Sequence, residues 1–164
     1  HDGRWRRSIF ALMRRTQIPG LLESFDYPQM GPNCLQRNES LTATQSLQLL
    51  NSKEVHDLAG RLATDVLKEA GQVLPLSADV AARQHRVEVL AQRIYCRAPS
   101  TTELELLLGG LTDLVQEWER SGDLKNGTVT AASAVPDTAA AAEVRAFENL
   151  CHALLNSAAF STIE

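Results

Sequence analysis

Asp26 and Arg37 are the two residues whose types and spacing could support binding or catalysis in this chain. A carboxylate and a guanidinium that flank one loop can bind a polar ligand, or they can close the loop through a bidentate ion pair. We favour the ion pair. Glu23 lies three residues before Asp26 and could form a general acid/base pair with it, but spacing alone does not decide this. Asp26 and Arg37 are therefore the candidate catalytic residues.

Histidine and cysteine residues do not have the spacing of a metal or haem site. The sequence contains no His-x-x-x-His, no Cys/His cluster and no acidic calcium loop. Cys151-His152 matches the end of a haem-attachment motif, but Glu148 stands where the first cysteine of that motif belongs. We therefore expect neither a metal nor a cofactor on this chain, and we expect His56 to face solvent.

The three cysteines, Cys34, Cys96 and Cys151, are far apart in the sequence. A chain of 164 residues can bury about 70% of its unfolded surface, so it needs no disulfide to fold. We expect three buried thiols, and the alternative is one disulfide with a leftover thiol.

Charge is distributed unevenly along the chain. Residues 1–15 contain five arginines and one aspartate, whereas the remainder has 11 basic and 19 acidic residues. A basic arm can bind nucleic acid, an anionic membrane or another anionic polymer such as a polysaccharide. We expect it instead to pair with the acidic remainder or with another part of a longer parent chain. No apolar run reaches the ~20 residues of a membrane span, and the start does not read as a signal peptide.

Apolar periodicity predicts helices and no strand. A first helix is predicted over residues 5–18, followed by an ordered, irregular loop over residues 20–40. Residues 121–136 have no apolar period and are predicted to form a mobile loop. Further helices are predicted over residues 42–50, 53–70, 80–97, 100–118 and 137–160.

Capping boxes are predicted at two helix starts. Thr42 with Gln45, and Ser100 with Glu103, have the required three-residue spacing. Arg97 is expected to tie its loop to the second of these helices through Glu103.

Two further features concern helix ends and helix packing. The tetrapeptide Leu49-Leu50-Asn51-Ser52 recurs at residues 154–157, and both copies are expected at helix ends, with Asn51 in the left-handed conformation. Gly109-Gly110 lies inside a long apolar stripe, so close helix packing is expected there.

These patterns predict an all-α fold, an irregular bundle of about five to six helices with a long ordered loop in the first third. We expect one domain over residues 1–164. Within it, residues 1–52 form a polar, motif-bearing segment and residues 53–164 form amphipathic helices.

Several short blocks carry a resemblance to a known family. They comprise Arg7, Ser8, Phe10 and Arg14-Arg15; Phe25-Asp26-Tyr27-Pro28; Cys34, Arg37, Ser40, Thr42, Gln45, Leu47 and Leu49-Leu50-Asn51; Arg97 to Leu104; and Leu154 to Phe160. In order and spacing they resemble the planctomycete-specific C-terminal domain of unknown function found in large exported proteins, many of which begin with a c-type cytochrome domain. Phe10, Ala43 and Ser46 stand where that family usually has Tyr, Pro and Ala.

The resemblance implies a context rather than a reaction. It suggests a C-terminal fragment of an exported multidomain protein, located in the periplasm or at the cell surface, with any haem on another domain. We expect a module that docks on the preceding domains, without catalysis of its own, in a protein that handles electrons or polysaccharide. The alternative is that the first third, with Asp26 and Arg37, completes an active site with the preceding domain in an enzyme acting on polysaccharide.

Overall fold

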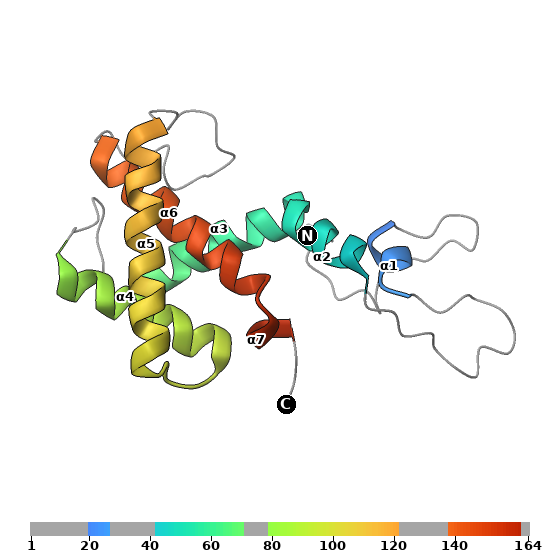
Figure 1. The fold of residues 1–164 in the computed structure, drawn as a ribbon, viewed down its shortest axis with the longest axis horizontal. Helices are drawn as coiled ribbons and strands as arrows, with labels where there is room; N and C mark the ends of the chain where they lie inside the picture. Colours follow the sequence, from blue (N-terminus) through green and yellow to red (C-terminus); the bar gives the residue numbers. More distant parts are fainter. Residues whose placement is uncertain (1–19, 27–41, 71–78, 122–137, 162–164) are drawn as a thin grey trace, which may run out of the picture. The chain divides into compact units, whose positions relative to one another are not determined.

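The computed structural model describes residues 20–26, 42–70, 79–121 and 138–161. All regular secondary structure in these ranges is helical, which confirms the predicted all-α fold (Figure 1). The predicted first helix, the loop over residues 27–41 and most of the predicted mobile loop lie outside the described residues. The helices are α1 (Gly20–Ser24), α2 (Ala43–Asn51), α3 (Lys53–Glu69), α4 (Val80–Tyr95), α5 (Thr101–Ser121), α6 (Thr138–Leu155) and α7 (Ala158–Ser161).

The chain divides into two compact units. Unit 1 is His1–Gln48 and unit 2 is Leu49–Glu164, so the division falls within α2. The helices α3 to α7 belong entirely to unit 2. None of the helices in the described ranges is long and apolar enough to cross a membrane.

In unit 1, a short helix occupies the start of the segment that we predicted to be irregular. Ser24 Oγ donates to the Gly20 carbonyl at 2.8 Å, and Gln45 Nε2 donates to the Ser24 carbonyl at 2.9 Å. Five residues are too few to show helical periodicity, and so short a helix depends on contacts from elsewhere in the chain. The tie from Gln45 is such a contact, and sequence spacing does not reveal it.

The start of α2 has part of the predicted cap, and its end differs from the prediction. Gln45 Oε1 accepts from the Thr42 backbone N–H at 3.1 Å, which is half of a capping box. Asn51 is the last helical residue of α2 and does not have a positive φ, so the left-handed prediction was wrong. The reason is Ser52, which adopts φ −70 and ψ 125 and caps α3 at once by accepting from Val55 N–H. This direct junction leaves no position for a left-handed residue.

The junction between α4 and α5 departs from prediction at its cysteine. Cys96 is the left-handed C-cap of α4 (φ 54), and it is exposed rather than buried as predicted. A cap residue lies beyond the packed face of its helix, so the apolar stripe of α4 does not include it. The capping box of α5 is confirmed, because Ser100 N–H donates to Glu103 Oε2 at 2.7 Å and Glu103 N–H donates to Ser100 Oγ at 3.3 Å.

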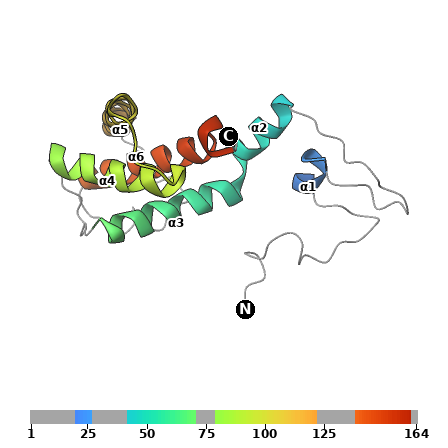
Figure 2. The same cartoon turned by 90° about the horizontal axis from the view of Figure 1, so that it is seen from below.

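Helix α6 forms the centre of unit 2. It packs against α5 on one side and α3 on the other, and α4 and α7 contact it as well (Figures 1 and 2). Every residue from 141 to 148 is buried. The predicted stripe of the last helix is confirmed at its buried positions, which are Val144, Phe147, Leu150, Cys151 and Leu154.

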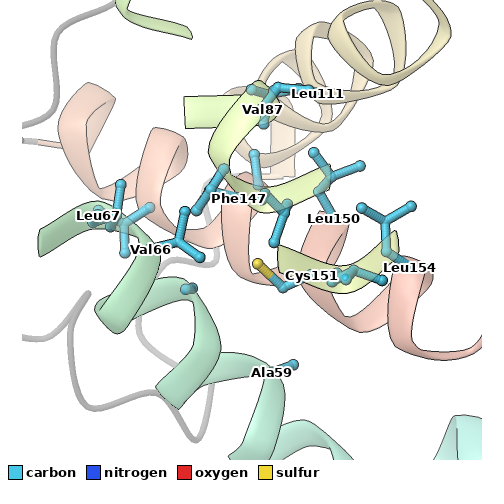
Figure 3. Packing of buried hydrophobic residues seen from close by; sticks show 14 of the residues in the cluster. Ala59, Val66, Leu67, Val87, Leu111, Phe147, Leu150, Cys151 and Leu154 are labelled. Carbon is cyan, nitrogen blue, oxygen red and sulfur yellow. The ribbon is translucent and has the colours of Figure 1, made fainter. Parts of the chain in front are cut away.

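The core gathers apolar side chains from α3, α4, α5 and α6 (Figure 3). Val66, Val87, Leu111 and Phe147 are each at most 1% exposed, and burying a side chain of this size stabilises the fold by about 1.5–3 kcal/mol. Phe160, which we placed on the same stripe as Phe147, is instead 48% exposed on α7. The chain turns at residues 156–157, so the apolar stripe of α6 does not continue to Phe160.

The glycine pair in α5 does not mark a close helix contact. Apart from the backbone of α5 itself, a Cβ placed on Gly109 or Gly110 would meet no atom of the described residues within 4 Å. The prediction of tight packing at this point was therefore wrong, since the neighbouring helices pack on other residues of α5, including Leu111 and Val115.

Candidate functional site

One of the two candidate catalytic residues lies in a described segment. Asp26 follows α1 with φ 53, a left-handed conformation that Asp tolerates better than most residues. Glu23 is exposed on α1. Arg37 lies outside the described residues, so the ion pair between Asp26 and Arg37 remains a prediction.

Charged side chains in the interior of unit 2 gather around α6. Glu143, Arg145 and Glu148 are 3–4% exposed, and Arg86 of α4 is fully buried. Charged residues are almost never buried unless they are paired. We did not predict these positions from sequence. The available signal is that residues 143–148 place charges on more than one face of the helix, which a helix with a single buried stripe does not do.

Glu143 joins α6 to α4 through both of its carboxylate oxygens. Arg83 Nη2 donates to Oε1, and Arg86 Nη2 donates to Oε2 at 3.3 Å. Burial lowers the pKa of Arg86, and the Glu143 carboxylate opposes that effect. Both oxygens engage guanidinium groups of the same chain, which indicates a structural ion pair rather than a general base.

Glu148 has a different environment one turn further along α6. Both of its carboxylate oxygens are buried without a hydrogen-bond partner among the described residues, and Arg145 Nη1 lies 3.9 Å from Oε2. Burial raises the pKa of Glu148 to about 7, an effect that the Arg145 charge partly offsets. A carboxyl group with this pKa can exchange a proton near neutral pH. At 4% exposure, however, no substrate can reach it in this conformation.

The two described cysteines are free thiols in contrasting surroundings. Cys151 is buried, and burial, followed by the nearby Glu148, raises the pKa of its thiol far above the ordinary value. The thiolate is the nucleophilic form, so Cys151 is an inert structural thiol. Cys34 lies outside the described residues.

His56 and His152, on α3 and α6, are brought together by the fold. Their ring centroids are 3.9 Å apart and the rings are inclined by 11°, which is a stacked arrangement. His56 is exposed, as predicted, but one face of its ring is stacked on the ring of His152. Burial, and then the charge of His56, lower the pKa of His152, whereas a hydrogen bond with the backbone of Leu50 acts in the opposite direction.

The stacked geometry argues against a shared metal ion. The nitrogen lone pairs of an imidazole lie in its ring plane, so two nearly parallel rings cannot both point at one ion. Within the described ranges, no group of three or more His, Cys, Asp and Glu residues could hold a metal.

Arg97 and Glu103 form an exposed, bidentate ion pair. Arg97 Nη1 and Nη2 donate to Glu103 Oε2 and Oε1 at 2.8 and 2.6 Å, and the guanidinium lies 5.4 Å from the centroid of the Tyr95 ring. Arg97, followed by the hydrogen bonds from Ser100, lowers the pKa of Glu103 to about 2. The predicted tie between loop and helix is confirmed, and its partners are those of a helix cap.

Comparison with known proteins identifies one similarity. Residues 1–111 match the model of the family described as "PSD1: Protein of unknown function (DUF1553)", and this match covers more than half of the chain. Neither a curated protein nor a solved structure matches the chain. The matched region includes Asp26, Arg37 and His56, whereas all of α6 lies beyond it.

Proposed function

The chain belongs to the DUF1553 family of proteins of unknown function, and from that premise we propose that it is a helical docking module of a larger exported protein. Its partner in this proposal is the preceding part of the same longer polypeptide, located outside the cytoplasm. The handling of electrons or of polysaccharide is assigned to those other domains. The support for this context is the resemblance of the sequence blocks described above.

Exposed leucines carry the docking proposal. Six large apolar side chains among the described residues are 44–72% exposed, and two of them, Leu50 on α2 and Leu58 in the first two turns of α3, lie close together in the sequence of unit 2. Single exposed apolar residues are ordinary on a protein surface, whereas a group of them indicates a contact surface. Leu50 and Leu58 both belong to unit 2 and are 47% and 44% exposed, so this part of the chain is our candidate for the docking contact.

Calorimetric titration of this chain with the separately expressed remainder of its longer protein tests the proposal. We expect binding with a negative heat-capacity change, because apolar surface becomes buried. The double variant Leu50→Asp/Leu58→Asp should bind at least about tenfold more weakly. Val80→Asp is the matched control, since Val80 is 72% exposed on α4 and should not affect binding. The docking proposal is abandoned if the unaltered chain does not bind.

A contribution to an active site is the second candidate function. The observation that favours it is the left-handed backbone of Asp26, because unusual backbone conformations occur at functional sites. In this alternative, Asp26 and Arg37 complete a site for polysaccharide with the preceding domain. Asp26→Asn keeps a residue that tolerates this conformation and removes the charge. Loss of turnover in the longer protein, with an unchanged melting temperature, would support catalysis, and full turnover would exclude it.

A further inference from the structure

The stacked imidazole rings of His56 and His152 connect the start of α3 to the end of α6, both in unit 2. His152 also holds the junction between α2 and α3, through a hydrogen bond with the backbone of Leu50. One turn later, Asn156 Nδ2 donates to the His152 carbonyl at 2.8 Å and closes the end of α6. His152 therefore connects the junction between α2 and α3 to the end of α6.

Protonation is unfavourable in this arrangement for two separate reasons. Two charged rings 3.9 Å apart repel each other, and in bulk water alone this repulsion changes an equilibrium constant about fivefold. An imidazolium also carries a proton on each nitrogen. Nε2 of His152 is buried and has no hydrogen-bond partner in the described part of the chain, so a proton there would have no acceptor.

We propose that His56 and His152 form a pH-sensitive clip, which holds the α2–α3 junction against the end of α6 when both rings are neutral and releases it when both are protonated. The released state is a local opening of unit 2 in which the rings separate and become hydrated. The inference concerns this chain itself and holds whatever the chain docks on.

The other charged groups on the helices that carry or contact the clip are mostly paired or exposed. On α5, which packs against α6, Glu103 pairs with Arg97 and Glu117 pairs with Arg120. The remaining acidic residues of α5 are exposed, and they are Glu105, Asp113 and Glu119. On α3, Lys53 and Asp57 are close to His56 in sequence and pair with each other at 2.9 Å. On α6, Glu148 precedes His152 by one turn and favours the imidazolium when it is ionised.

Ala43–Asn51 of α2 contains no ionisable side chain, and residues 158–160 of α7 contain none either. The ionised residues of α4 that face α6, Arg83 and Arg86, are both paired with Glu143.

The direction in which the pKa of His152 changes on folding agrees with the proposed clip. The pKa of His152 is lowered from its ordinary value of 6.5 by burial and by His56. The folded state therefore takes up this proton less readily than the unfolded state. The stability that the neutral ring provides is fully present above pH 6.5 and is lost as the pH falls through the lower folded pKa.

Hydrogen exchange of backbone amides in the unaltered chain tests the clip. The amide of His56, which donates to the Ser52 carbonyl at 3.1 Å, reports on the first turn of α3. The amide of Val87, in the core, reports on global unfolding. After correction for intrinsic exchange, we expect the protection of the His56 amide to fall at least about fivefold between pH 7.5 and pH 5. The protection of the Val87 amide should not fall in parallel.

The double variant His56→Phe/His152→Phe keeps two stacked rings and removes both titrations, so its amide at position 56 should show no such loss. His85→Phe, an exposed site on α4, is the matched control and should behave like the unaltered chain. The clip is overturned if protection at residue 56 is unchanged by pH, or if the double variant shows the same loss. If the double variant does not fold, an NMR titration decides, because a His152 ring that titrates at or above 6.5 also overturns the proposal.

Discussion

Glu148 places a carboxyl group in the interior of unit 2 without a hydrogen-bond partner among the described residues. The neutral form of such a group costs less to bury than the charged form, which is why its pKa is raised to about 7. Glu148 lies one turn before His152 on α6. As the pH rises towards 7, Glu148 lowers the free energy of unfolding whereas His152 raises it. These two effects partly cancel, so neither can be read from the pH dependence of stability unless one of the two residues is replaced.

Replacing Glu148 with Gln should change how stability depends on pH. Between pH 4.5 and about 7, the unfolded chain releases the Glu148 proton while the folded chain retains it. The free energy of unfolding of the unaltered chain therefore loses about 1–3 kcal/mol from this residue as the pH rises through that interval. Urea denaturation at pH 5 and pH 8 should show that Glu148→Gln lacks this loss.

The exposed Glu105 of α5 offers a control for this measurement, since Glu105→Gln should leave the pH dependence unchanged. An identical pH dependence in Glu148→Gln and the unaltered chain would show that Glu148 is hydrated and carries an ordinary pKa.

At the scale of the helices, the reliable predictions are those that depend on neighbouring residues. Ser100 with Glu103 caps α5 as predicted, because a capping box needs only residues within one turn. The prediction for Asn51 failed because the end of α2 depends on Ser52, which already serves as the cap of α3. Gly109-Gly110 was misjudged for a related reason. Glycine permits close packing, but only the neighbouring helices decide whether another chain segment approaches.

Replacing both glycines of α5 with alanine should stabilise the protein. A methyl group at either position would meet no atom of the described residues within 4 Å outside the backbone of α5, so alanine adds no clash with them. Each substitution also reduces the freedom of the unfolded chain. Gly109→Ala and Gly110→Ala should each raise the free energy of unfolding by about 1 kcal/mol, and the double variant by about 2 kcal/mol. Chemical denaturation of the single and double variants measures these values. Destabilisation by either substitution would show that another segment packs against this face of α5.

For the whole of unit 2, the decisive feature is the central position of α6. Neighbouring helices pack on both sides of it, so even its charged side chains are buried (Figure 2). Glu143 then becomes a cross-helix contact, because it accepts from Arg83 and Arg86 of α4. Buried ion pairs often give little net stability compared with apolar residues, but removing one partner is costly.

Glu143→Gln should therefore destabilise the protein by about 3–5 kcal/mol, since it removes the negative charge that faces the buried guanidinium of Arg86 and the partly buried one of Arg83. Thermal or urea unfolding measures this loss. The double variant Arg86→Met/Glu143→Met replaces charges with apolar side chains of similar length and should lose less than Glu143→Gln alone. A cost below about 1 kcal/mol for Glu143→Gln would show that these guanidinium groups are hydrated.

The sequence by itself determined the all-α class, the approximate bounds of α2 to α6 and the caps at Thr42 and Ser100. These features follow from periodicity and from hydrogen bonds within one turn, and both are local. Only the tertiary structure decided that α6 is enclosed, that Glu148 is buried and that His56 stacks on His152. Burial and long-range pairing depend on which helix faces meet. The sequence around a residue does not show which distant residue it will contact in the folded chain.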